Sequence, residues 1–145
     1  MNKIEDFYVL LGQTLDFCQR IEHDLKWIYA LLNVNDYSET LENVKKNTLG
    51  EILGLLKNID LKGNPYFDSS DFTFLNSITY KRNYYCHECF NTFNYERDVA
   101  TWNKTFNNEY QKLLKFNFEL NDMSTQILKA RKYLYGIIKK NDLVF

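Results

Sequence analysis

The helical character of this chain is clearest over residues 7–32, which read FYVLLGQTLDFCQRIEHDLKWIYALL. Mostly apolar side chains recur there in alternating steps of four and three residues, at Phe7, Leu11, Thr14, Cys18, Ile21, Leu25, Ile28 and Leu32. This spacing places one apolar stripe along about seven turns of an α-helix. An average step of about 3.5 residues suits lengthwise packing against a neighbouring helix. The stretch therefore predicts a long helix within a bundle.

Three further helices are predicted after this stretch. The second begins at Thr48, which forms a capping box with Glu51, and Gly63–Pro65 is the strongest break. The third is predicted over roughly 70–95 and the last over about 104–140. The seam of the third helix is expected to consist of Leu75, Thr79, Arg82, Cys86, Cys89 and Phe93. The last helix places apolar residues at intervals of seven, at Phe106, Leu113, Leu120, Ile127 and Leu134.

The composition favours a single helical domain. The chain has 145 residues, of which 45% are hydrophobic, and this is enough apolar material for a real core. It contains only five glycines and one proline, whereas all-β folds need many turns built from these residues. We therefore expect an all-α fold, an antiparallel bundle of about four long helices, formed as one domain over residues 1–145.

Several classes of protein are disfavoured. No apolar run reaches the roughly 18 residues that a membrane helix needs, and the first residues lack the basic and then apolar order of a signal peptide. Three cysteines are an odd number, which argues against a disulfide scaffold and fits a reducing compartment. We expect a cytoplasmic protein that does not bind membranes. The net charge of −1 gives no bulk electrostatic argument for nucleic acid binding.

A polar cluster interrupts the seam of the third predicted helix. Arg82 stands at a seam position, and buried arginine is rare unless it is paired. Asn83 and His87 are four residues apart and therefore share one helix face. Arg82 and His87 are five residues apart, which is about 140° around the helix. These side chains flank one strip of the helix surface, so we expect them to converge on one small anion.

The types of these residues indicate a chemistry. The planar guanidinium of Arg82 suits phosphate oxygens, the imidazole of His87 can transfer a proton near neutral pH, and Asn83 can orient either group. None of them is a nucleophile, but RNA supplies its own in the 2′-hydroxyl. A base and a phosphate clamp without a carboxylate cage therefore fit metal-independent RNA cleavage that leaves 2′,3′-cyclic phosphate and 5′-hydroxyl ends. We expect neither a metal nor a cofactor.

Cleavage of this kind benefits from an acid as well as a base, yet the third predicted helix carries a single histidine. A twofold dimer would bring two copies of this helix together. We therefore predict a homodimer with the site at its interface. Lys81 and Tyr84 are weaker candidates for RNA contact, and a single-stranded RNA or a tRNA loop is favoured because in-line attack needs a flexible backbone.

The string Arg82-Asn83-Tyr84-Tyr85-Cys86-His87 resembles the signature of the HEPN family, in which an arginine and a polar residue are followed by three residues and a histidine. The aromatic Phe90, three residues after the histidine, also fits. The resemblance implies a helical bundle that dimerises and shares a ribonuclease site between protomers, in which Arg82 and His87 are catalytic and Asn83 supports them. It also implies a toxin or antiviral defence effector controlled by an antitoxin or regulatory protein.

Two other functions stay open. The chain can be a non-catalytic HEPN-like module that binds RNA or a partner protein as an antitoxin, sensor or adaptor. It can also be a helical scaffold in which Arg82, Asn83 and His87 form a structural network that sets the dimer register. An acidic residue of the first helix, Glu22 or Asp24, is a candidate partner for Arg82 across the bundle.

Two further groups have ordinary structural interpretations beside functional ones. Cys86 and Cys89 are spaced like zinc ligands, but on a continuous helix they are better explained as small seam residues. A basic cluster at the end of the last helix is explained by favourable charge at a helix C-terminus, with an RNA-backbone track as the alternative. This cluster comprises Lys129, Arg131, Lys132, Lys139 and Lys140.

Overall fold

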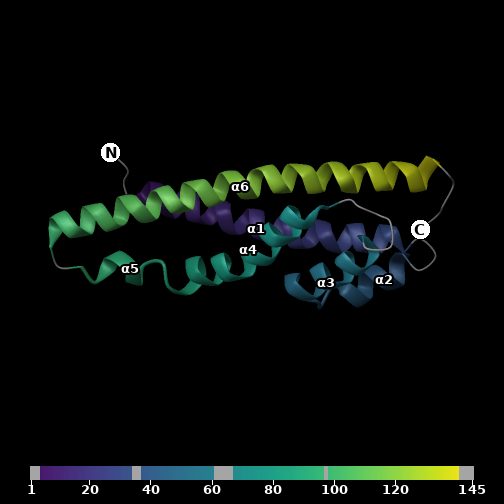
Figure 1. Ribbon diagram of the computed structural model, residues 1–145, viewed down its shortest axis with the longest axis horizontal. Helices are drawn as coiled ribbons and strands as arrows, with labels where there is room; N and C mark the ends of the chain where they lie inside the picture. The colour runs from purple at the N-terminus through teal and green to yellow at the C-terminus, as the bar shows by residue number, and fades with distance from the viewer. Residues whose placement is uncertain (1–3, 34–36, 61–66, 97, 141–145) are drawn as a thin grey trace.

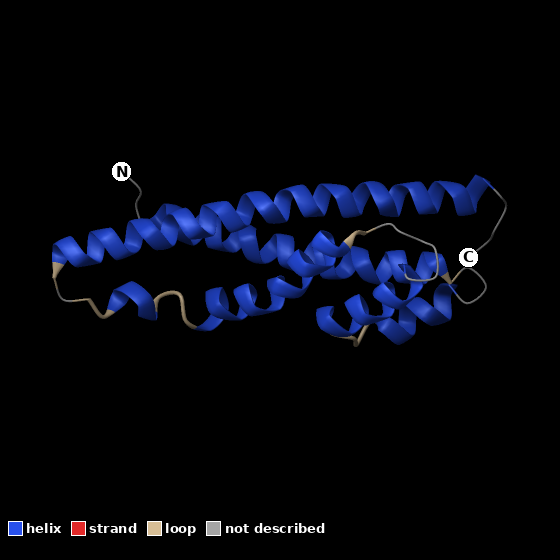
Figure 2. Cartoon of the chain, viewed as in Figure 1, coloured by secondary structure: helices blue, strands red, loops and turns tan. Residues whose placement is uncertain are grey.

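The computed structural model describes residues 4–33, 37–60, 67–96 and 98–140, and these residues form six α-helices and no strand (Figure 2). The helices are α1 (Ile4–Leu32), α2 (Tyr37–Val44), α3 (Leu49–Asp60), α4 (Ser69–His87), α5 (Asn91–Asn94) and α6 (Val99–Lys140). The predicted all-α class is confirmed, whereas the predicted number of about four helices is too small. Among the described residues, no helix is both long enough and apolar enough to cross a membrane.

α1 and α6 form the longest pair and run side by side along the molecule (Figure 1). Six of the eight residues of the predicted stripe of α1 are buried, whereas Leu11 and Leu32 are partly exposed. The residues of α6 at intervals of seven, from Phe106 to Leu134, are also all buried. Residue spacing alone therefore located the two faces that meet in the core.

The direction of α6 differs from the prediction. Phe7 packs on Phe106, with ring centroids 5.7 Å apart, and the side-chain amide of Asn117 donates a hydrogen bond to the Thr14 hydroxyl at 3.1 Å. Contacts therefore advance together along both helices, so α1 and α6 are parallel. In an antiparallel bundle of four full-length helices the first and last would run in opposite directions. The prediction is wrong because α2 and α3 are short and do not span the bundle.

α2 and α3 pack beside one end of α1, whereas α5 lies at the other end (Figure 1). The sequence patterns did not predict α2, which buries Tyr37 and Val44. α3 begins at the predicted capping box: the Glu51 N–H donates to the Thr48 hydroxyl and the Thr48 N–H donates to the Glu51 carboxylate, each at 3.2 Å. The predicted break at Gly63–Pro65 lies outside the described residues.

α4 is shorter than the predicted helix over residues 70–95. It begins at a capping box in which the Asp71 N–H donates to the Asp68 carboxylate at 2.8 Å and the Asp68 N–H donates to the Asp71 carboxylate at 3.0 Å. It ends where the N–H groups of Glu88 and Cys89 both donate to the Tyr84 carbonyl, at 2.8 and 2.9 Å. A turn then leads to α5.

An aromatic cluster explains why α4 ends at His87. The rings of Phe90 and Phe93 each lie 5.7 Å from that of Phe7, centroid to centroid. The turn directs both rings onto α1, which a continuation of α4 would not do. As a result Cys89 and Phe93 are fully buried while Cys86 is exposed. The predicted seam is therefore wrong at Cys86, because the buried face of α4 continues through Tyr85 and not through Cys86.

Candidate functional site

α4 carries the five predicted site residues over about its last two turns, but their side chains enter three different surroundings. Arg82 contacts α1, and Lys81 and Tyr84 line a cleft against α6. Asn83 and His87 are exposed. Neither makes a side-chain hydrogen bond or ion pair to any residue that the structure describes.

Arg82 is held by an acidic residue of α1. Its Nη1 lies 3.8 Å from Oε1 of Glu22, and each side chain is between a quarter and a third exposed. The other carboxylate oxygen of Glu22 lies 3.7 Å from Nζ of Lys26. Glu22 is therefore the partner of Arg82 that was expected from the first helix. The other candidate, Asp24, pairs instead with Arg131 of α6 at 2.7 Å.

Cys18 lies beneath this ion pair. Burial raises the pKa of its thiol to about 11, although the nearby Arg82 guanidinium opposes the shift by favouring a thiolate. The thiol therefore stays protonated and packs as a small apolar group. Cys18 therefore does not compete with Glu22 or with a ligand for the Arg82 guanidinium.

One face of α4 is not covered by any residue that the structure describes. Asn76, Tyr80, Asn83 and His87 recur at steps of four, three and four, and all four are exposed. We call these residues the open face of α4. Arg82 lies at its edge, turned toward α1. Among the described residues, Arg82 therefore contacts α1 while His87 lies on the open face, and a second surface opposite the open face would complete a site that uses both.

Lys81 and Tyr84 meet residues of α6 in a cleft of about 380 Å³, which we call the α4–α6 cleft. Lys112 and Lys115 enter it from α6, and Glu119 is the one acidic residue of its described lining. The floor is aromatic: Tyr85 stacks on Phe116 with a ring separation of 5.7 Å. Sequence reasoning missed Lys112 and Lys115, because their spacing on α6 does not reveal which helix they face.

Lys81 is positioned by the same floor. Its Nζ lies 5.0 Å from the centroid of the Phe116 ring and 5.6 Å from that of Phe74. Such cation–π contacts hold an ammonium group without neutralising it. The α4–α6 cleft therefore combines aromatic surface with three lysines, a composition suited to an anion that carries a flat ring.

The hydroxyl of Tyr84 is engaged within the protein. It donates a hydrogen bond to Oε2 of Glu109 at 2.6 Å, and the Thr92 hydroxyl lies 2.8 Å from it. Burial, followed by the bond to Glu109, raises the pKa of Tyr84 to about 12. Glu109 is only 3% exposed, and its other carboxylate oxygen lies 3.5 Å from Nζ of Lys112. Tyr84 can therefore offer its ring to a ligand, but its hydroxyl stabilises Glu109.

The cysteines do not gather into a ligand set. Cys18, Cys86 and Cys89 are free thiols, and only Cys86 is exposed. Within the described part of the chain, no group of three or more His, Cys, Asp or Glu side chains is placed to hold a metal ion.

The HEPN resemblance rests on the local motif from Arg82 to His87 and on the helical fold around it, and it stays a prediction. Comparison of the chain with protein-family models, with curated proteins and with solved structures found no match.

Proposed function

We propose that this chain is a metal-independent endoribonuclease that works as a homodimer, with Arg82, Asn83 and His87 at the site. One observation carries the proposal. α4 presents Asn83 and His87 on an uncovered face with Arg82 at its edge, and this helix also forms a wall of the lysine-lined α4–α6 cleft. A second copy packed on the open face would add its own motif to the first. The HEPN resemblance supports the same arrangement, and with it a role as a toxin or antiviral effector under a protein regulator.

The proposed reaction uses the substrate's own nucleophile. His87 accepts the proton of a ribose 2′-hydroxyl, and the 2′-oxygen attacks the adjacent phosphorus. Arg82 stabilises the negative charge of the pentacoordinate phosphate through its planar set of N–H donors. The bond from phosphorus to the 5′-oxygen breaks, and that oxygen receives a proton from His87 of the partner subunit. The products are a 2′,3′-cyclic phosphate and a 5′-hydroxyl.

Arg82 must change its contacts for this reaction. Its ion pair with Glu22 is long, at 3.8 Å, and partly exposed, so it contributes at most about 1 kcal/mol to stability. A phosphate can compete with such a partner, since guanidinium–phosphate bonds are strong and bidentate. Glu22 therefore restrains Arg82 in the free chain without blocking it.

The test is incubation of the full chain with a single-stranded RNA and with a DNA of the same sequence, both in EDTA. We expect cleavage of the RNA to 2′,3′-cyclic phosphate ends and no cleavage of the DNA, which lacks the 2′-hydroxyl. His87→Ala should lower the cleavage rate by at least about 100-fold, which is typical for loss of a proton-transfer group. Arg82→Ala should lower it by a similar factor, because it removes the group that stabilises the charge on the pentacoordinate phosphate.

Glu88→Gln is the matched control, because Glu88 is exposed and directly follows His87. Its cleavage rate should equal that of the unmodified chain. Circular dichroism of each variant establishes that the helices are intact. RNA cleavage that survives His87→Ala in a folded protein, or cleavage of the DNA at an equal rate, contradicts the proposal.

A second function is favoured by the α4–α6 cleft alone. Three lysines around an aromatic floor suit binding of single-stranded RNA without cleavage. In that case the RNA stays intact in the assay above but is retained in a gel-shift experiment. Lys115→Gln should then weaken binding and reduce its dependence on salt concentration. This outcome assigns the chain to the non-catalytic modules.

A further inference from the structure

A second cleft lies where the C-terminal part of α6 passes Trp27 of α1. It encloses about 470 Å³, within the range of roughly 300–1,000 Å³ that small-molecule sites occupy. We call it the Trp27 cleft. Besides Trp27, its lining consists of Leu128, Arg131, Lys132, Tyr135 and Gly136. It is separate from the open face of α4 and from the α4–α6 cleft.

The described lining of this cleft favours an anion. Its two charged members, Arg131 and Lys132, are both basic, and it contains no carboxylate. The whole chain has a net charge of −1, so the positive character is a local property of this cleft. The basic cluster noted at the end of the last helix thus contributes two of its members to one concave site.

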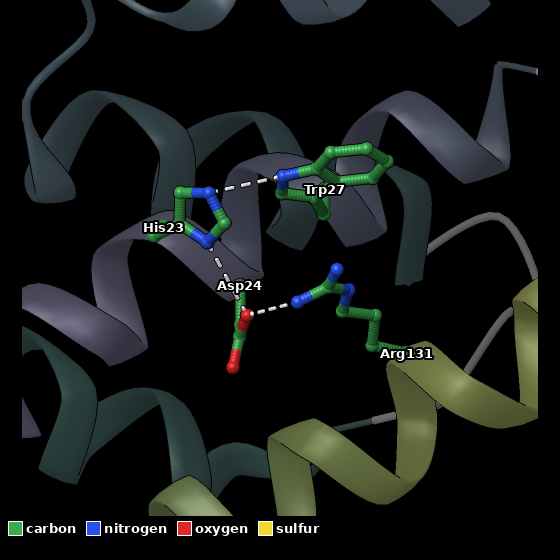
Figure 3. Close-up of polar contacts among 4 residues, drawn as sticks. All are labelled: His23, Asp24, Trp27 and Arg131. Atoms are coloured by element: carbon green, nitrogen blue, oxygen red, sulfur yellow. Dashed lines mark hydrogen bonds and ion pairs between the residues drawn. The ribbon is translucent and has the colours of Figure 1, made fainter.

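Arg131 is held in place before any ligand arrives (Figure 3). Its Nη1 donates to Oδ1 of Asp24 at 2.7 Å, and its guanidinium lies 4.8 Å from the centroid of the Trp27 ring. Asp24 is only 8% exposed, whereas the side chain of Arg131 is 32% exposed, so the carboxylate is sheltered from water while the guanidinium can be reached by a ligand. An arginine carries five N–H donors, and the bond to Asp24 uses one of them. A guanidinium that is held in position and still has N–H donors for a ligand is preorganised for a phosphate.

The same network orients Trp27 (Figure 3). The indole N–H donates to Nε2 of His23 at 3.1 Å, and Nδ1 of His23 lies 3.4 Å from Oδ1 of Asp24. Since Nε2 accepts this bond, the neutral imidazole carries its proton on Nδ1 and points it at Asp24. Two contacts therefore link the indole to the carboxylate that holds Arg131, and they restrain the orientation of Trp27 in the wall of the cleft.

The rest of the described lining is largely apolar and partly exposed. Leu128 is 39% exposed and Tyr135 is 44% exposed, which leaves flat and aliphatic surface beside the two basic groups. Gly136 has no side chain, and a Cβ built on it would meet nothing within 4 Å. A planar ring can lie against this part of the cleft while an attached anion reaches Arg131 and Lys132.

We propose that the Trp27 cleft binds a nucleotide, with the phosphate on Arg131 and Lys132 and the base against Tyr135 and Leu128. The same chemistry is offered by a free mononucleotide and by one nucleotide of an RNA strand. The site does not depend on RNA cleavage at α4, so its test stands apart from that of the proposed function.

The test is calorimetric titration of the full chain with adenosine monophosphate, adenosine, inorganic phosphate and a short single-stranded RNA. We expect a dissociation constant below about 1 mM for adenosine monophosphate. Adenosine and phosphate should each bind at least tenfold more weakly, because each offers half of the recognised chemistry. Binding of the RNA but not of the mononucleotide, with the same response to the variants below, assigns the source of the nucleotide to RNA.

Gly136→Leu is the principal variant. Its side chain would occupy the cleft, and it should fold because the space is open and leucine favours a helix more than glycine does. We expect binding to weaken at least tenfold. Lys132→Gln removes an exposed charge without touching the core and should also weaken binding several-fold. Gly54→Leu in α3, where a Cβ also meets nothing within 4 Å, should leave affinity unchanged.

Three results would overturn the proposal. The first is that neither adenosine monophosphate nor the RNA binds at millimolar concentration. The second is equal affinity for phosphate and for adenosine monophosphate, which would assign the cleft to an anion alone. The third is binding by Gly136→Leu that is as tight as binding by the unmodified chain. If the leucine variant fails to fold, undiminished binding by Lys132→Gln overturns the proposal instead.

Discussion

Replacing Tyr84 by phenylalanine tests whether its hydroxyl stabilises the protein. The change removes the 2.6 Å hydrogen bond to Glu109 and leaves the ring in place. A hydrogen bond to a charged group contributes about 1.5–3 kcal/mol. Glu109 is 3% exposed, so water cannot readily replace the lost donor. Nζ of Lys112, 3.5 Å from the other carboxylate oxygen, still offsets part of the negative charge of Glu109. We therefore expect the free energy of unfolding to fall by about 2 kcal/mol.

The measurement is urea unfolding followed by circular dichroism. With a denaturant slope of about 2 kcal/mol/M, the midpoint should fall by about 1 M. Tyr80→Phe is the matched control: it makes the same chemical change one turn earlier on α4, at a side chain that is 79% exposed. Surface substitutions of this kind change stability by less than about 0.5 kcal/mol.

A double-mutant cycle with Glu109→Gln isolates the interaction itself. The two single changes should not be additive, and the coupling energy between Tyr84 and Glu109 should exceed about 0.5 kcal/mol. If Tyr84→Phe costs no more than Tyr80→Phe, or if the changes at Tyr84 and Glu109 are additive, the hydroxyl does not stabilise Glu109 and this reasoning is wrong.

The pKa of Tyr84 gives the same bond a pH dependence. Because the folded state raises this pKa from about 10 to about 12, the stabilisation is fully present below pH 10 and is lost as the pH rises toward 12. The difference in unfolding free energy between the unmodified chain and Tyr84→Phe should therefore narrow in that window. A difference that widens would contradict the assignment.

Two further predictions concern the three thiols and the ion pair between Asp24 and Arg131. Cys86 should react rapidly with a thiol reagent at pH 8, whereas Cys18 and Cys89 should react only after denaturation. Both of these are buried, and burial raises the pKa of each thiol to about 11. Equal reaction rates at all three thiols would contradict the described packing. Arg131→Gln should lower the unfolding free energy by about 2 kcal/mol, because it leaves the carboxylate of Asp24 without its cation. The loss is smaller than for a fully buried pair, because the side chain of Arg131 is 32% exposed and Nδ1 of His23 still contacts Asp24. An unchanged urea midpoint would show that the carboxylate of Asp24 is not sheltered.

The long helices and their core faces could be predicted from the sequence. The stripe from Phe7 to Ile28 in α1 and the repeat from Phe106 to Leu134 in α6 are buried because helical periodicity depends only on local geometry. The capping box at Thr48 is equally local and was found for the same reason.

The end of α4 could not be predicted in this way. The residues from His87 to Phe90 include neither glycine nor proline, so nothing in the local sequence stops the helix. It ends because Phe90 and Phe93 pack on Phe7, a residue more than 80 positions earlier. The burial of Phe93 follows from this distant contact, and periodicity could not predict where the helix ends.

Taken alone, the order of residues determined that the chain is helical and that Arg82, Asn83 and His87 share one helix. The tertiary structure decided what these groups and their neighbours face: Glu22 opposite Arg82, and Lys112 and Lys115 opposite Lys81. It also decided that α1 and α6 run parallel. Periodicity records which side of a helix is apolar, whereas the partner of that side depends on helix lengths and connections across the whole chain.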